Sequence, residues 1–505
     1  MKLYSAFRDD RLLLTLTAML TLAAWAPLFV TPFLPLSDLP NNAAAASMLF
    51  DAATGKGTVG EHYYVSLAPT PYWTGYIVMA AANAVGGVLF AAKAIVALLA
   101  IVMPLSVMRL LIALGRSPRL GLWAFAMFWE HNLYSGWVTY LLGMAIALYA
   151  LARLIEVETL REGYHLLPWT VLVALTHAQA VALLAVAGVA LTLRRGLRGR
   201  PMAPQVLALA GGALPVLAWA RGHVSPSGNV ASPPWTFDWH PWVGKAARLS
   251  TYTFDPYPRE PAVWAPAFAF AAMLLCPLLV ATLVRPRGGR RERTIDAAII
   301  TLSCVALYAA LPFEIRGPMR HFHNYPRYAT FILLTLLLLP NPDLRGWRAL
   351  ALVPGIVAAA AMDVTTLHQF QRFADHSRPF LRLMDAVPRG SRVLPLINVD
   401  SDPACAYDPY NQFHSYLTAA TRSYDPYLFD NPSNPLQYTA SHRLDAPPWA
   451  VATDQVSMER QGEQFDYVLV QGLARDPFEP GARLAGARVH LVAEGGIWRL
   501  YAVDR

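Results

Sequence analysis

Charged side chains are scarce in this chain: Asp, Glu, Lys and Arg together make up 15% of the 505 residues, whereas 55% are hydrophobic. One soluble core cannot bury so much apolar surface, which excludes an ordinary soluble globular protein. Cysteine is nearly absent, with three in total. Cys276 and Cys304 lie inside apolar runs and Cys405 is alone in the polar tail, which argues against a disulfide framework.

Basic residues outnumber acidic ones, giving a net charge of +8, but they are not spread along one face. They gather in short clusters between apolar runs, as in RRGLRGR at 194–200 and RPRGGRRER at 285–293. Such clusters are typical of the cytoplasmic loops of membrane proteins, which carry an excess of lysine and arginine. The pattern argues against nucleic acid as a partner, because nucleic-acid-binding proteins concentrate positive charge on one surface.

Long apolar runs predict an α-helical polytopic membrane protein with about eleven transmembrane helices, since each run is long enough for a hydrocarbon core of about 30 Å. The clearest runs are 12–34, 89–112, 119–135, 137–154, 202–220, 262–284, 295–313, 326–340 and 346–362. The first is too long for a signal peptide, so we expect an uncleaved span with a cytoplasmic N-terminus.

The placement of two segments relative to the membrane has to be decided between alternatives. The run 166–193 is divided into two short spans that meet near Thr176 and His177, because two spans keep the arginines on both sides of the run in the cytoplasm. The segment 71–87, PYWTGYIVMAAANAVGG, ends in paired glycines. It is predicted to lie in, or dip into, the membrane–water interface on the outer side of the membrane. Both choices rest on the same charge rule.

This layout divides the chain into a membrane bundle over 1–362, with a long first outer loop at 35–70, and an extracytoplasmic domain over 363–505. In the second part charge rises and apolar runs shorten. A helix is predicted over 368–387, followed by strands at 392–399, 465–472, 487–494 and 497–504. The sequence therefore predicts a small C-terminal α/β domain.

The first outer loop supplies Asp38, in SDLPNN, a few residues beyond the first span. A carboxylate there can act as a general base or hold a divalent cation, Mg²⁺ or Mn²⁺. The alternative is a helix cap, because Asp favours the start of a helix such as the one expected near Pro40. Glu61 and His62 of the same loop are candidate substrate-binding residues beside an aromatic, proline-rich stretch that is also typical of an interfacial anchor.

Further polar residues gather where spans reach the outer surface. Glu130, His131 and Asn132 lie in the turn 130–136, where Glu130 is a candidate catalytic carboxylate and a simple helix end is the alternative. His177 lies where the two short spans meet, so it is either a substrate ligand or a buried histidine paired with a carbonyl group. In the loop 314–325 and just after it, cations and imidazoles suited to a lipid phosphate occur at Arg320, His321, His323 and Arg327.

Taken together, these segments resemble the GT-C class of membrane glycosyltransferases, which use polyprenyl-phosphate sugars as donors. The resemblance covers residues 1–362 and rests on arrangement: an acid in a long first outer loop (SDLPNN), an interfacial helix (PYWTGYIVMAAANAVGG), a basic turn (VMRLLIALGRSPR), an acid in a short outer turn, half-spans around LTHAQA, and an Arg-Tyr pair at 327–328. It implies that Asp38 is the catalytic base or a metal ligand. The loop has SDLP rather than a paired-acid motif.

The resemblance implies an inverting glycosyltransferase that moves a sugar from a polyprenyl phosphate to a glycan, lipid or protein acceptor on the outer side of the membrane. Arg327, with Arg320, would bind the departing phosphate. Two other classes stay open: a transporter or flippase for lipid-linked or small molecules, and a non-catalytic membrane assembly protein. Composition rich in alanine, arginine and proline favours a bacterial inner membrane, with the C-terminal domain in the periplasm.

Overall fold

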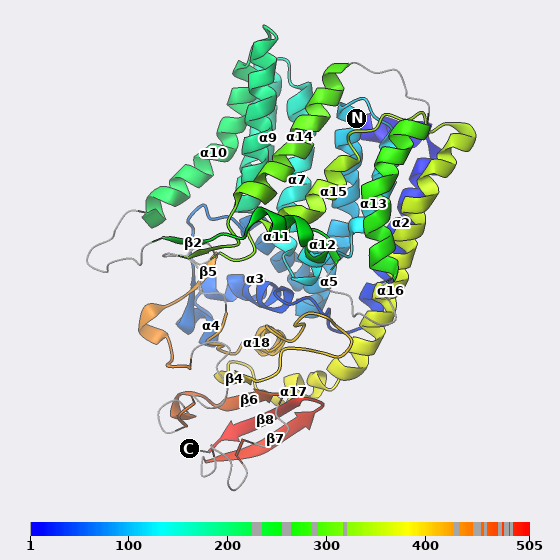
Figure 1. Ribbon diagram of the computed structural model, residues 1–505. Helices are drawn as coiled ribbons and strands as arrows, with labels where there is room; N and C mark the ends of the chain where they lie inside the picture. The colour runs from blue at the N-terminus through cyan, green and yellow to red at the C-terminus, as the bar shows by residue number, and fades with distance from the viewer. Residues whose placement is uncertain are drawn as a thin grey trace.

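The protein is described from a computed structural model over residues 2–224, 235–254, 264–284, 291–316, 321–428, 434–447, 456–458, 462–472, 477–478, 484 and 488–504. Helices form a bundle in the upper part of the molecule, and a smaller mixed part lies below it (Figure 1). The N-terminus lies at the top of the bundle and the C-terminus at the far end of the lower part.

Seven helices of the described chain are long and apolar enough to cross a membrane. They are α2 (Arg11–Val30), α5 (Trp73–Ala113), α7 (Val138–Glu156), α9 (Ala178–Leu197), α13 (Trp264–Leu283), α14 (Arg291–Ala310) and the 3-10 helix η3 (Gly346–Leu352) with α16 (Val353–Ser377). The shorter apolar stretch Ala203–Trp219 lies within α10 (Ala203–Val224). The chain is an integral membrane protein, and the predicted count of eleven spans is not confirmed.

Two predicted junctions are confirmed. Helix α5 breaks at Gly87, whose φ of 79° and ψ of 179° are not helical, so 71–87 and 89–112 are separate helical pieces. Glycine adopts such a backbone without the steric cost that a Cβ would add. The run 166–193 also forms two helices, α8 (Leu160–Ala174) and α9, which meet at residues 175–177.

Two other predicted spans are wrong in form. The run 119–135 is the 3-10 helix η1 (Pro118–Met127) followed by the short α6 (His131–Tyr134), and the run 326–340 is η2 (Pro326–Tyr328) followed by α15 (Ala329–Leu336). Residues 120–127 are all buried inside the protein. Irregular backbone is tolerated at membrane depth when protein covers it, so an apolar run alone does not specify a lipid-facing α-helix.

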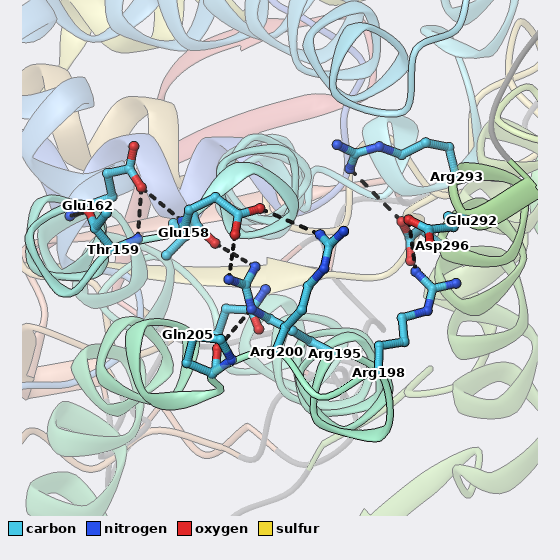
Figure 2. Close-up of polar contacts among 12 residues, drawn as sticks. Glu158, Thr159, Glu162, Arg195, Arg198, Arg200, Gln205, Glu292, Arg293 and Asp296 are labelled. Carbon is cyan, nitrogen blue, oxygen red and sulfur yellow. Dashed lines mark hydrogen bonds and ion pairs between the residues drawn. The ribbon is translucent and has the colours of Figure 1, made fainter.

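A network of ion pairs (Figure 2) closes the bundle at the end where the N-terminus lies, opposite to the C-terminal part (Figure 1). Arg195 at the end of α9 pairs with Glu158 at 2.6 Å, and Arg194 pairs with Asp296 of α14. The N-terminus lies on the same side, because Lys2 pairs at 3.1 Å with Glu156 at the end of α7. The predicted grouping of the arginine clusters on one side, away from the C-terminal domain, is therefore confirmed.

The lower part contains the predicted strands. They form a four-stranded sheet in the order β4 (Val393–Ile397), β6 (Tyr467–Gln471), β8 (Trp498–Val503), β7 (Val489–Gly495), with β4 and β6 parallel and the other pairs antiparallel. Helix α16 runs without a break through the predicted boundary at 362–363 and leads to α17 (Phe380–Ala386), as the helix predicted over 368–387 requires.

Smaller elements connect the two parts. The helices are α1 (Lys2–Asp9), α3 (Leu39–Ala53), α4 (Gly57–His62), α11 (Trp242–Ala247), α12 (Thr251–Phe254), α18 (Ser415–Thr421), η4 (Ala440–His442) and η6 (Gly462–Gln464). Two antiparallel strand pairs join β1 (Tyr63–Val65) to β5 (Leu436–Tyr438) and β2 (Thr236–Asp238) to β3 (Glu314–Arg316). Helix α3 lies across the lower end of the bundle, between it and α18 (Figure 1).

A buried aromatic cluster fixes the C-terminal part against the first outer loop. The ring of Phe33, just after α2, lies 4.9 Å from that of Phe413, and Phe413 stacks on Trp498 of β8 at 5.4 Å. Phe380 of α17 lies 5.1 Å from Trp498. All four residues are fully buried. Burial of such large rings supplies much of the packing free energy at this junction, so the two parts form one core.

Candidate active site

A cavity of about 920 Å³ lies between the outer ends of the membrane helices and the C-terminal part. Six residues predicted from the sequence line it together: Asp38, His131, His177, His321, His323 and Arg327. Asp38 and Arg327 are 289 residues apart in the sequence, so folding brings these residues together. The opposite wall is formed by residues between 407 and 447.

Asp38 does not cap a helix with its side chain. It precedes α3, but its carboxylate makes no capping hydrogen bond and instead accepts one from Trp137 Nε1 at 3.1 Å. The backbone N–H of Asp38 donates to the carbonyl oxygen of Ser135 at 3.1 Å. Burial raises the pKa of Asp38 to about 6, although the charge of Arg327 and the Trp137 hydrogen bond act in the opposite direction. Asp38 is thus a carboxylate aimed at the cavity and suited to proton transfer near neutral pH.

Arg327 is held by its backbone, which leaves the guanidinium available to the cavity. Its carbonyl oxygen accepts hydrogen bonds from Tyr140 Oη at 2.8 Å and Asn132 Nδ2 at 3.3 Å. The guanidinium carbon lies 4.0 Å from the ring centroid of Trp137, in a cation–π contact. Arg327 Nε is buried without a hydrogen-bond partner among the described residues. The site therefore holds a cation that lacks an anionic ligand within this set.

His177 places a second donor beside Arg327. Its Nδ1 accepts from the backbone N–H of Gln179 at 3.2 Å, and its Nε2 lies 3.2 Å from Arg327 Nη1. Burial and the charge of Arg327 lower the pKa of His177 well below its usual value, so the ring is neutral. A neutral imidazole has one acceptor nitrogen. If Nδ1 accepts, Nε2 carries the proton, and two N–H donors face the same space, where an anionic oxygen would satisfy both.

The remaining histidines are neutral as well. Burial, together with the charge of Arg327, lowers the pKa of His131 to about 3 and that of His323 to about 4. The pKa of His321 is lowered for the same reasons. Among the described residues no three His, Cys, Asp or Glu side chains gather as a metal site. A divalent cation therefore has no ligand cluster in this set, and its involvement stays a prediction.

Glu130 and Asn132 have a different position from the predicted one. The Glu130 carboxylate is 1% exposed, does not line the cavity and caps α6 by accepting from the backbone N–H groups of Asn132 at 2.9 Å and Leu133 at 3.2 Å. It also accepts from Thr330 of α15. Burial raises its pKa to about 7. Through these contacts Glu130 holds α6 against α15. The Asn132 side chain donates to the backbone carbonyl oxygen of Arg327 and so helps to position that residue.

Glu61 and His62 also lie outside the cavity lining. Glu61 is exposed at the end of α4, and His62 is buried, with Nδ1 2.7 Å from the carbonyl oxygen of His442. The His62 ring packs 4.5 Å from that of Tyr424. The structure therefore places both residues outside this cavity, with His62 against the C-terminal part, and their role in substrate binding stays a prediction. Arg320 lies outside the described residues.

The sequence pattern missed several lining residues. Tyr72 begins α5 with a left-handed φ of 94°, and its ring contacts that of His177 at 5.3 Å. A left-handed backbone at a bulky residue is uncommon and often marks a functional site. Tyr72 and Trp137 had the pattern of interfacial anchors, and no local signal identified the wall Tyr407, Asp408, Asn411, Gln412, Tyr427 and Arg443.

Comparison with known proteins supports the predicted architecture. No protein-family model and no curated protein matches the chain. Among solved structures, the chain is similar to the crystal structure of ArnT from Cupriavidus metallidurans bound to undecaprenyl phosphate, with a TM-score of 0.53 and 12% sequence identity. The similarity covers 97% of each chain, so it includes the C-terminal part as well as the bundle. The chain has the GT-C fold.

Proposed function

We propose that this chain, which has the GT-C fold, is a membrane glycosyltransferase that moves a sugar from a polyprenyl-phosphate donor to an acceptor bound in the cavity. The observation that carries the proposal is that a carboxylate and a guanidinium contact the same indole at this cavity. Asp38 and Arg327 both contact Trp137 within the same cavity.

The departing phosphate fits Arg327 and His177. Arg327 Nη1 and His177 Nε2 lie 3.2 Å apart, and an anionic oxygen beside the pair would lie within hydrogen-bond reach of both. The solved structure that this chain resembles is bound to undecaprenyl phosphate, a lipid of the proposed donor class. Stabilising charge on the leaving oxygen lowers the barrier more than a general acid would, because a phosphate is already a good leaving group.

Asp38 would supply the base. The acceptor hydroxyl oxygen forms a bond to the anomeric carbon while the bond from that carbon to the phosphate oxygen breaks. The hydroxyl proton goes to Asp38, and the lipid phosphate leaves with the bonding electron pair beside Arg327. A single displacement of this kind inverts the anomeric configuration. Asp38 is well suited because its pKa of about 6 leaves it ionised at neutral pH and still basic.

Transfer of labelled sugar by the purified protein in lipid discs tests the proposal, with a panel of polyprenyl-phosphate sugars as donors. We expect Asp38→Asn to lose at least a hundredfold in kcat, within the range of a general base. Arg327→Ala should lose both donor affinity and turnover.

Matched controls lie close to each target. Asp51→Asn changes a carboxylate of α3 that pairs with Arg422 at 2.8 Å, and Arg316→Ala changes an exposed arginine of β3. Both should retain transfer. Full activity of Asp38→Asn would refute the proposal, as would donor binding by wild type without transfer to any acceptor. The second result would favour the transporter or the assembly protein.

A further inference from the structure

Trp137 contacts both groups on which the proposed reaction depends. Its indole Nε1 donates to Asp38 Oδ2 at 3.1 Å, and its ring face lies 4.0 Å from the Arg327 guanidinium. Asp38 and Arg327 influence one another's charge, yet no ion pair within 4.0 Å joins them in the described part of the chain. The indole is the group that both residues share.

The orientation of the indole is itself fixed. The backbone N–H of Trp137 donates to the carbonyl oxygen of Asn132 at 3.0 Å, which closes the turn before α7. The rings of His131 and His323 contact the indole at 5.6 Å and 5.5 Å between centroids. Both imidazoles are neutral at physiological pH because their pKa values are lowered by burial. Trp137 is thus held by groups that add no competing charge.

An opposite charge pair at the surface of a cavity gains attraction as water is excluded. If Asp38 and Arg327 closed into an ion pair, the carboxylate would become a weaker base because a nearby cation stabilises its charged form. The guanidinium would also be occupied and unable to bind a phosphate. A flat apolar ring with one N–H donor prevents this collapse while still satisfying each partner, the carboxylate at the ring edge and the cation on the ring face.

We infer that Trp137 is a positioning residue that separates the proposed base Asp38 from the proposed phosphate ligand Arg327 and keeps each of them available to its substrate. The inference rests on the proposed function and deepens it. One carboxylate oxygen is occupied by the indole N–H, which directs the other towards the acceptor hydroxyl. The ring face keeps the guanidinium on the side of the cavity where His177 lies.

Two substitutions distinguish the contribution of the indole N–H from that of the ring face. Trp137→Phe keeps a ring against Arg327 but removes the N–H, whereas Trp137→Ala removes both. For Trp137→Phe we expect a donor KM within twofold of wild type and a kcat about tenfold lower, in the range of one lost charge-assisted hydrogen bond. The acid limb of the pH profile should move up, because the N–H no longer stabilises ionised Asp38.

Trp137→Ala should have the opposite pH effect. Without the ring, Arg327 can approach Asp38, so the acid limb should move down while the donor KM rises at least tenfold. The other ionisable groups that line this cavity stay in both variants: Tyr72, His131, His177, His321, His323, Tyr407, Asp408, Tyr427 and Arg443. Opposite shifts are not expected from a general loss of structure, which would reduce folded yield without changing the direction of the pH effect.

Trp129→Phe is the matched control, because its indole also donates to a carboxylate, that of Asp363 at 3.1 Å, but outside the cavity lining. It should leave the acid limb and the donor KM unchanged. Wild-type kcat and pH profile in Trp137→Phe, or shifts of the same sign in both Trp137 variants, would overturn the inference. An inactive wild type or an active Asp38→Asn would instead overturn the proposed function, so the two failures are distinguishable.

Discussion

At the scale of single residues, Gly136 determines where Asp38 lies. Its φ is +78°, and a Cβ at this position would come within 2.4 Å of Leu39 N and 2.6 Å of Asp38 N. The turn 130–136 can therefore approach the first outer loop closely only through a residue without a side chain. The backbone hydrogen bond from Asp38 to Ser135 depends on this approach.

We expect Gly136→Ala to reduce transfer at least tenfold and to lower stability by more than the cost of the backbone conformation alone. A non-glycine residue in the left-handed region costs about 1–2 kcal/mol, and the contact with backbone atoms adds to it. Gly199→Ala is the control, because Gly199 has a φ of +69° but nothing within 4 Å of its Cβ position. Transfer assays and thermal unfolding of both variants check this. Equal behaviour of the two would show that the close approach is unimportant.

The sequence predicted some residues of the cavity lining and did not single out others, and both outcomes have physical reasons. Asp38 was assigned as the base from the resemblance in arrangement, and Arg327 because guanidinium groups match phosphate oxygens. Trp137 was not singled out, since an interfacial tryptophan has the same local pattern whether it faces lipid or a cavity. Glu130 lies outside the cavity lining, and a carboxylate that caps a helix has the same sequence signal as a catalytic one.

At the scale of elements, the ion-pair network opposite the cavity joins α9, α14 and the α7–α8 connection (Figure 2). Asp296 of α14 pairs with Arg194 of α9, and both side chains are mostly buried, 15% and 13% exposed. Removing the Asp296 carboxylate leaves the Arg194 guanidinium without this counterion in a poorly hydrated position, which costs free energy of folding. The network therefore holds α9 and α14 together at this end of the bundle.

We expect Asp296→Asn to destabilise the protein by about 2 kcal/mol, an estimate between a surface pair and a fully buried one. Asp9→Asn is the control, because the Arg8–Asp9 pair is 66% and 63% exposed and should contribute nothing measurable. Thermal unfolding of both variants in the same detergent makes the comparison. A normal melting temperature for Asp296→Asn would show that the network is not a structural brace.

Prediction succeeded at the junction that charge constrained and failed for two runs that rested on hydropathy alone. The division of 166–193 at His177 followed from arginines on both sides, and α8 and α9 meet there. The runs 119–135 and 326–340 had no such constraint. Their apolar residues face other protein segments, so the backbone takes 3-10 and short helical forms that a hydropathy pattern does not distinguish from a span.

At the scale of the whole molecule, the cavity exists because two parts distant in sequence form one core. The wall between 407 and 447 is held over the first outer loop by the Phe33–Phe413 contact and by a hydrogen bond from Asn41 Nδ2 to Gln412 Oε1 at 2.9 Å. Sequence patterns report local structure, and they carry no signal for packing between segments some 370 residues apart. The C-terminal wall therefore had to come from the fold.

The same fold separates charge between the two ends of the bundle, and this makes orientation testable. We expect the cavity to face the periplasm, because the arginine clusters lie at the opposite end and lysine and arginine are retained in the cytoplasm. Glu61→Cys places an exposed thiol on the cavity side, and Arg161→Cys places one near the ion-pair network. A membrane-impermeant maleimide applied to spheroplasts should label the first, and the second only after the membrane is disrupted.

Wild type provides the background for this labelling, since Cys304 and Cys405 are buried and Cys276 is partly buried. The opposite labelling pattern would place Asp38 and Arg327 on the cytoplasmic side. Donors would then have to reach the site from the inner leaflet, and the charge rule that organised the whole topology would fail for this chain. Agreement would instead mean that one feature, the position of the arginines, determines which end of the bundle carries the chemistry.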